Sequence, residues 1–193
     1  MARRKEFDSE QALAKAMAVF WRLGYGNTSL ELLLREMGIA KQSLYDTYGD
    51  KRRLYMKALA HYRRQTNDGL RRLFGAGRPV KDAFAKLLFG LSAESKHQHE
   101  RGCLLLSANL ERDTSDAALA EFLRDNHAEV EGIFTEALLR ARKAGELPRN
   151  ADTKALARFF IVTIQGMRAL ARLRSDRKSL EQVARLALAT LDR

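Results

Sequence analysis

Apolar residues recur every three or four positions along most of this chain, and the alternation of apolar and polar residues that marks a β-strand is absent. Only two prolines interrupt the sequence, at positions 79 and 148. The pattern therefore predicts an all-α protein of about nine helices. The expected helices cover residues 8–23, 28–37, 41–48, 51–73, 79 to about 91, 103–110, 115–145, 152–174 and 179 onward.

Residues 28–51, TSLELLLREMGIAKQSLYDTYGDK, contain the pattern of two short helices joined by a glycine turn. Thr28 and Glu31 have the spacing of a capping box, in which the threonine hydroxyl accepts from the Glu31 amide, so the first helix is expected to begin at Thr28. Gly38 can adopt the left-handed conformation that ends this helix, and the second helix follows at residues 41–48. This arrangement is typical of a helix-turn-helix, which makes DNA the leading partner.

The second of these helices has one face suited to DNA. Leu44 is its apolar position, and at about 100° per residue Gln42 and Asp46 point most directly away from it, flanked by Ser43 and Tyr45. Polar side chains of this kind hydrogen-bond to base edges in the major groove. Gln42 and Ser43 are therefore the candidates for reading bases.

The surrounding sequence resembles the DNA-binding domain of the tetracycline-repressor (TetR) family of bacterial one-component regulators. The resemblance covers residues 8–60 and rests on ALAKAMAVFWRLGYGNTSL, a Gly-Ile turn and SLYDTYGDKRRLYMKAL, in that order. It implies an N-terminal DNA-binding domain at 1–50 and an effector-binding and dimerisation domain at 51–193, connected through the long helix at 51–73. It also implies a homodimer that binds a palindromic operator in double-stranded DNA.

The chain departs from the family pattern at two positions of the second helix. Family members usually cap this helix with Ser or Thr, whereas this chain has Ala40, which forfeits on the order of 1 kcal/mol of capping free energy. Position 46, often neutral or basic in relatives, is Asp46, an acid close to the phosphates of bound DNA. Asp46 either accepts from a cytosine amino group or turns away from the DNA.

Four further side chains are candidates near the DNA. Thr28 resembles the family residue that meets a phosphate, although its predicted cap alone would account for it. Lys41 and Lys51 each lie beside a helix start, where phosphate contact is favoured over plain solvation. Tyr45 can direct its hydroxyl to a phosphate, whereas Tyr48 is expected to pack inside the small domain.

The net charge of +11 favours polyanionic partners, and the excess is concentrated near the motif. Residues 1–64 hold 13 basic and 7 acidic residues, so about a third of the chain carries a surplus of 6. Arg3, Arg4 and Lys5 form a basic arm that can reach along phosphates or into a minor groove. A disordered terminus accounts for the arm equally well.

The last two expected helices are broadly apolar and suit either a dimer interface or the monomer's own core. The first carries an apolar face, with Gly166 permitting close approach of another helix, and the second repeats the pattern from Leu180 to Leu191. The resemblance favours the interface, since it implies twofold dimers joined through a four-helix bundle of these helices. The apolar face of the first helix comprises Leu156, Phe159, Phe160, Thr163, Ile164, Met167 and Leu170.

The segment RGCLLLSANLE, residues 101–111, resembles a Gly-Cys-Leu element found in one branch of the family. The resemblance implies that Cys103 is a candidate sensor of electrophiles or oxidants. A lone cysteine before an apolar run is more often a small buried hydrophobe. No second cysteine exists for an intramolecular disulfide. His97 and His99 do not form an established metal site with Cys103, and solvated loop histidines are the expectation.

The resemblance also implies a cavity for a small-molecule effector between the head and the dimer bundle, although packed core is the alternative for most of its candidate residues. No sequence rule identifies the ligand. The candidate lining residues, besides Cys103, are Phe84, Leu88, Leu106, Phe122, Phe134 and Phe160.

The sequence can be compared with three classes of function. The leading one is a ligand-controlled dimeric regulator, a repressor released by a small-molecule or thiol-reactive effector; a sequence-independent nucleic-acid-binding protein is the alternative. An enzyme is poorly supported, because the chain has no glycine-rich phosphate loop, no nucleophile elbow and no cofactor or metal motif. The single cysteine, and the lack of a signal pattern or an apolar run near 18 residues, favour the cytoplasm over a membrane.

Overall fold

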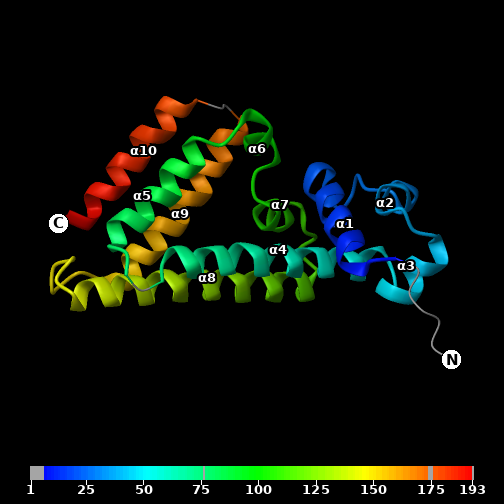
Figure 1. Ribbon diagram of the computed structural model, residues 1–193, viewed down its shortest axis with the longest axis horizontal. Coiled ribbons are helices and arrows are strands. Elements are labelled where there is room, and N and C mark those ends of the chain that lie inside the picture. The colour runs from blue at the N-terminus through cyan, green and yellow to red at the C-terminus, as the bar shows by residue number, and fades with distance from the viewer. Residues whose placement is uncertain (1–6, 76, 174–175, 193) are drawn as a thin grey trace. The chain divides into compact units, whose positions relative to one another are not determined.

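The computed structural model describes residues 7–75, 77–173 and 176–192, and within these ranges all of its regular secondary structure is helical (Figure 1). The described residues form ten α-helices, one more than the sequence predicts, followed by a short 3-10 turn, η1 (Thr190–Asp192). None of the helices in these ranges is long and apolar enough to cross a membrane. The α-helices are α1 (Ser9–Leu23), α2 (Leu30–Met37), α3 (Lys41–Tyr48), α4 (Lys51–Leu73), α5 (Val80–Ser92), α6 (Lys96–Arg101), α7 (Leu104–Glu111), α8 (Ala117–Lys143), α9 (Thr153–Leu173) and α10 (Arg177–Ala189).

The chain divides into two compact units that each contain separate stretches of sequence. The first unit comprises the residues up to Gln65 and the stretch Cys103–Glu121, and the second comprises Thr66–Gly102 and the residues from Phe122 onward. The chain therefore passes from one unit to the other three times, within α4, between α6 and α7, and within α8. The division of function at residue 50, expected from the sequence, stays a prediction.

The first unit is built on an apolar core shared by α1, α2, α3 and the beginning of α4. Leu33, Leu44 and Leu54 are fully buried, as is Phe20, whose ring lies edge-on to Tyr55 at 4.9 Å between centroids. Burial of these side chains stabilises the unit through the hydrophobic effect. The core therefore fixes how α2 and α3 are presented.

Local caps set the helix boundaries in this unit. The Asp8 carboxylate accepts from the backbone amides of Glu10 and Gln11 and so caps α1, and Asp50 accepts from the Arg53 amide at the start of α4. Aspartate is among the residues that N-cap positions favour most strongly. The cap of α2 differs from expectation, because Ser29 and not Thr28 provides it.

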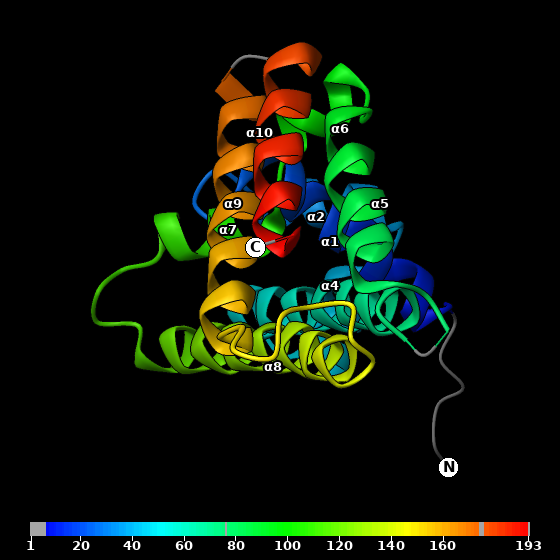
Figure 2. The ribbon, with the colours of Figure 1, turned by 90° about the vertical axis from the view of Figure 1, so that its left-hand side faces the viewer.

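The second unit packs α5, α9 and α10 together with parts of α4 and α8. Figures 1 and 2 show α10 lying alongside both α5 and α9. Phe84 lies at the centre of its core, with its ring stacked on Phe160 at 3.7 Å and edge-on to Phe134 at 5.2 Å between centroids. A salt bridge from Arg71 of α4 to Glu129 of α8 joins these two helices at the surface of the unit.

Helix α9 has two apolar faces rather than the single face predicted. Phe160 and Met167, expected at a dimer interface, are 0% and 2% exposed and belong to the core of the unit. A second face stays uncovered, with Val162 67% and Leu173 86% exposed. The sequence prediction therefore mixed core residues with surface residues, because both sets recur at helical spacing.

The polar stretch after α5 forms a helix, α6, where the sequence led us to expect a loop. Ser95 and Gln98 form a complete capping box that begins it. His99 is buried, and its Nε2 lies 2.8 Å from the carbonyl oxygen of Leu91, which accepts a hydrogen bond from the ring. The expectation of a solvated histidine is confirmed for His97 and wrong for His99. Among the described residues, no group of three or more potential ligands could hold a metal ion.

Candidate DNA-binding site

A glycine turn sets the angle between α2 and α3. Gly38 has φ 71° and ψ 36°, the left-handed conformation that a side chain would strain. The amides of Gly38 and Ile39 both donate to the carbonyl oxygen of Leu34, at 2.9 and 3.2 Å. These two bonds close the end of α2 and direct the chain into α3, as the sequence predicts.

The inner face of α3 is anchored in the unit by two residues. Leu44 is fully buried, and Tyr48 is 5% exposed with its hydroxyl donating to the carbonyl oxygen of Ser9 at 2.7 Å. Burial and the Coulombic effect of Asp8 raise the pKa of Tyr48. Tyr48 therefore packs inside the unit, which confirms the role expected for it.

The outer face of α3 presents polar side chains to solvent. Lys41, Gln42 and Tyr45 are exposed, whereas Ser43 is half-buried. Gln42 Nε2 donates to Asp46 Oδ1 at 2.8 Å, so Asp46 is engaged with its neighbour one turn away. The helix begins after Ala40, which provides no side-chain cap, as predicted.

Two lysines of α4 contact neighbouring segments of the first unit. Lys51 Nζ lies 4.3 Å from the centroid of the Tyr25 ring, in the geometry of a cation–π contact, and burial lowers the pKa of this lysine. Lys57 Nζ donates to the carbonyl oxygen of Thr47 at 3.1 Å, which joins α4 to the end of α3. Lys57 could not be predicted from the sequence, because a contact between residues ten apart on different helices leaves no local pattern.

The predicted capping role of Thr28 is wrong. Thr28 is 1% exposed, and its hydroxyl donates to the carbonyl oxygen of Gly24 at 2.6 Å. Ser29, which is exposed, caps α2 instead, because its hydroxyl accepts from the Leu32 amide at 3.1 Å. Burial also removes Thr28 from the side chains that can meet a phosphate directly, and Ser29 takes its place at the helix start.

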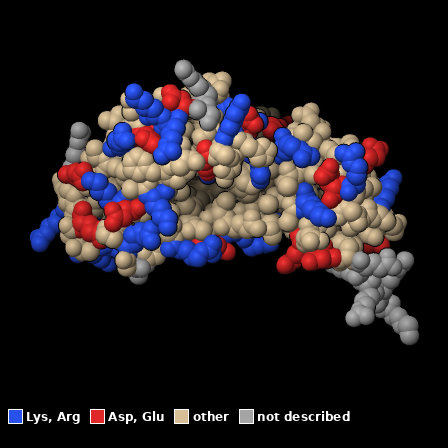
Figure 3. All heavy atoms as spheres, turned by 45° about the horizontal axis from the view of Figure 1, so that its top comes forward, with Lys and Arg blue, Asp and Glu red and all other residues tan. Residues whose placement is uncertain are grey.

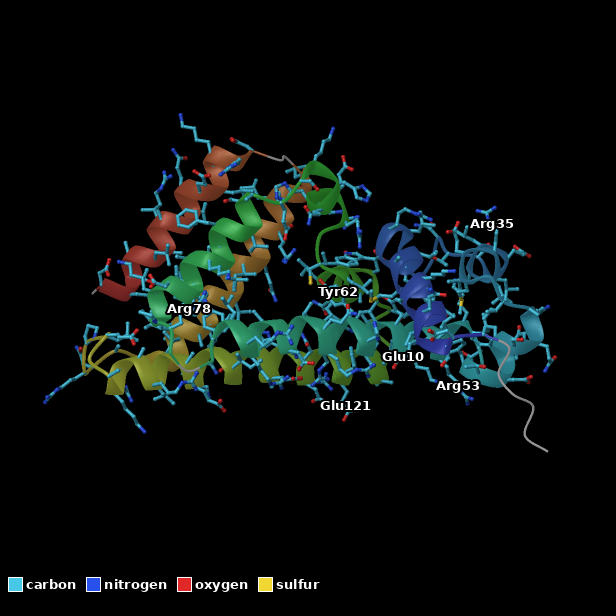
Figure 4. The ribbon with its side chains drawn as sticks, in the orientation of Figure 1. Glu10, Arg35, Arg53, Tyr62, Arg78 and Glu121 are labelled. Carbon is cyan, nitrogen blue, oxygen red and sulfur yellow. The ribbon has the colours of Figure 1, made fainter. Side chains whose placement is uncertain are left out.

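The two arginines after Lys51 have different surroundings. Arg52 donates through Nη2 to both carboxylate oxygens of Asp116, with the contact to Oδ1 at 2.7 Å. Arg53 lies on the first turn of α4 (Figure 4), where its exposed guanidinium is 3.6 Å from Asp50. Arg53 is therefore the more accessible cation.

Basic and acidic side chains are interspersed on the face drawn in Figure 3. The basic arm at residues 3–5 lies outside the described residues.

The residues expected around an effector are divided between the two units. Cys103 is half-buried at the position before α7, and Leu106 is half-buried on α7, both in the first unit. Phe122 is half-buried and belongs to the second unit.

Four of the predicted lining residues are packed in the core of the second unit, and their role at an effector stays a prediction. Phe84, Leu88, Phe134 and Phe160 are at most 1% exposed and pack against neighbouring apolar side chains. A pocket of about 210 Å³ in the second unit is lined by other residues, among them Phe74, Arg140 and Glu146. Apolar periodicity identified the buried face but could not distinguish a cavity wall from a core.

Comparison with known proteins places the whole chain among bacterial regulators. The family model for bacterial regulatory proteins of the tetR family matches residues 12–57, and the model for the tetracyclin repressor-like C-terminal domain matches residues 83–187. The chain is 34% identical to YezE of Bacillus subtilis (strain 168), an uncharacterised HTH-type transcriptional regulator, with both chains covered in full. It is 31% identical to the HTH-type transcriptional repressor ComR of Escherichia coli (strain K12), covering 98% of this chain and 90% of ComR.

A solved structure resembles the fold over nearly the whole length. It is a cysteine mutant of the TetR family transcriptional regulator CifR, complexed with 26-bp double-strand operator DNA. The TM-score is 0.86 at 31% identity, with 98% of this chain and 100% of the CifR chain covered.

Proposed function

Because the chain belongs to the tetR family of bacterial regulatory proteins, we propose that it is a dimeric repressor that binds a palindromic operator and leaves it when an effector binds. The observation that carries the proposal is the two-faced character of α3. Leu44 and Tyr48 fix one face in the core, while Lys41 and Gln42 stand exposed on the other. A short helix held in this way is suited to the major groove.

The side chains of the site divide into two roles at the DNA. Gln42 and Ser43 contact base edges, which carry sequence information. Lys41, Tyr45 and Lys51 contact phosphates, which fix the register of the helix on the duplex. The likeness to CifR, whose structure includes operator DNA, supports binding to a DNA duplex.

The exposed apolar face of α9 and α10 supports a homodimer. Large apolar side chains on one surface of a protein mark an interface. Gly166 lies within the face, and a Cβ built there would meet nothing within 4 Å, so a second helix can approach closely. Two copies bring two recognition helices to a palindrome, which one short helix cannot select alone. The exposed residues of the face are Phe159, Val162, Leu170 and Leu173 on α9 and Leu186 on α10.

The effector is a small molecule or a thiol-reactive compound, acting in the cytoplasm where the operator lies. The segment that follows Gly102 supports this part of the proposal, because Cys103 immediately precedes α7 in the unit that also contains the helix-turn-helix. Membership of the branch with the Gly-Cys-Leu element belongs to the same proposal. A ligand that binds one conformation more tightly shifts the population toward it, so affinity for the operator changes with effector concentration.

The proposal is tested by binding to the DNA upstream of the protein's own gene, measured by fluorescence anisotropy at several salt concentrations. Lys41→Ala removes one phosphate contact per subunit, or two per dimer, and should lower the slope of log K against log salt by about 1.8. Gln42→Ala should reduce the preference for the operator over random duplex. Lys86→Ala, which removes an exposed lysine of α5, is the matched control and should change neither quantity.

The net charge of +11 favours a second candidate, sequence-independent binding to nucleic acid. The two functions differ in one measurable ratio, the affinity for operator relative to random duplex. A steep salt dependence with equal affinity for both duplexes would establish the second candidate and reject the repressor. Preference for one site that falls in Gln42→Ala would establish the first.

A further inference from the structure

The exposed face of α3 contains an interaction that the family assignment does not explain. Gln42 and Asp46 lie one turn apart on the side of the helix opposite fully buried Leu44, and Gln42 Nε2 donates to Asp46 Oδ1 at 2.8 Å. Both side chains are exposed, so the bond contributes little to folding. An acid at the surface that meets a polyanion also opposes binding. Neither folding nor attraction to DNA therefore accounts for Asp46 at this position.

A carboxylate fixes the orientation of a neighbouring amide because it only accepts hydrogen bonds. A free glutamine can turn its amide over and exchange its oxygen with its NH₂ group. Beside Asp46, the NH₂ group of Gln42 must face the carboxylate. One N–H and the Oε1 acceptor of Gln42 then remain for a ligand.

One donor beside one acceptor matches a single base in the major groove. Adenine presents the N7 acceptor and the N6 amino donor, whereas guanine presents two acceptors, N7 and O6. A Gln42 amide held by Asp46 pairs with both atoms of adenine, but its oxygen would face the O6 oxygen of guanine. The geometry points to Asp46 as a positioning residue that makes Gln42 select an A·T pair in each operator half-site.

This inference rests on the proposed function, since it requires α3 to lie in the major groove. It assigns Asp46 neither to the phosphates nor to a cytosine. It also predicts that the Asp46 carboxylate has two opposite effects: it lowers the affinity for any DNA duplex, and it increases the preference for one base pair.

The test is selection of operator sequences from a random duplex library, followed by anisotropy measurements on the selected duplex and its base substitutions. With the wild-type protein, exchange of the A·T pair read by Gln42 for G·C in one half-site should weaken binding by about 5- to 160-fold. The pair is identified as the position whose preference disappears in Gln42→Ala.

Asp46→Asn is the informative variant, because an asparagine side chain both donates and accepts. It lets the Gln42 amide turn over and offer two N–H donors, so the variant should accept G·C at that position with less than about threefold loss. Removal of the negative charge should also strengthen its binding to random duplex. The melting temperature should not change, which separates positioning from a structural role.

Glu36→Gln is the control for charge alone. Glu36 is exposed on α2 and pairs with Arg35 at 3.6 Å, so the variant loses the same charge without touching Gln42. It should keep the A·T preference of the wild type.

Two outcomes would overturn the inference and one would overturn its premise. The inference is wrong if Asp46→Asn keeps the wild-type preference, or if Gln42→Ala removes preference for a pair other than A·T. If the wild-type protein selects no sequence from the library, the proposed function itself fails. These results are distinguishable within the same experiment.

Discussion

Helix α3 has no side-chain N-cap, so a substitution that adds one should raise the free energy of unfolding. Ala40 precedes α3 with φ −72° and ψ 154°, and it is exposed. Ser29, which caps α2, has φ −80° and ψ 157°, and its hydroxyl accepts from the amide three residues later. The two backbones differ by 8° in φ and 3° in ψ, so a serine at position 40 would reach the Ser43 amide without rearrangement.

Ala40→Ser should therefore raise the free energy of unfolding by about 1 kcal/mol per subunit, the usual contribution of an N-cap hydroxyl. For a chain of this length the corresponding rise in melting temperature is about 2 to 4 °C. Urea titration followed by circular dichroism, at fixed protein concentration, measures the change, since dimer stability depends on concentration.

Ser29→Ala is the mirror control, because it removes an existing cap from the neighbouring helix and should lower the free energy of unfolding by a similar amount. The reasoning would be refuted if Ser29→Ala destabilises the protein while Ala40→Ser leaves it unchanged or less stable. That combination would mean that the backbone before α3 does not have capping geometry.

Three further outcomes follow from burial and charge. Val162 is 67% exposed in the single chain, and Val162→Lys would bury an unpaired charge in a dimer interface, so light scattering should show monomers in place of dimers. An unchanged mass would exclude this face of α9 from the interface. Phe84→Ala should lower the free energy of unfolding by about 3 to 5 kcal/mol, because the ring is fully buried and stacked on Phe160, whereas an unchanged urea midpoint would indicate a cavity wall. Burial and, to a smaller extent, the charge of Glu111 raise the pKa of Tyr55 to about 12, so the unfolded chain loses the phenolic proton at lower pH than the folded protein does. The free energy of unfolding should therefore fall between pH 10 and 12 by on the order of 2 kcal/mol more than in Tyr55→Phe, and parallel pH profiles of the two proteins would contradict this.

Local chemistry made the helix-turn-helix readable from the sequence. The cap at Asp8, the left-handed Gly38 and the uncapped Ala40 each depend on a residue and its near neighbours. The capping box of α6 was equally local, since Ser95 and Gln98 have the required spacing, but the polar composition of the stretch obscured it. The spacing of Gln42 and Asp46 was also visible as an i, i+4 pair.

Contacts between distant segments could not be predicted in the same way. Thr28 and Ser29 are adjacent hydroxyl residues, and the turn after α1 decides between them by engaging Thr28 with Gly24. Phe84 and Phe160 lie 76 positions apart and stack on each other, so periodicity marked them as apolar without indicating their partner. A period of 3.6 likewise cannot separate the core face of α9 from the exposed one.

Binding of two α3 helices to one operator can be observed by hydroxyl-radical footprinting on the DNA upstream of the gene, because the footprint shows where and how many times the protein contacts the duplex. We expect protection of two half-sites related by twofold symmetry and separated by about one helical turn or a multiple of it, with both weakened together in Gln42→Ala. Protection of a single half-site, or protection spread along the duplex without a preferred sequence, would contradict a dimer that reads DNA through α3.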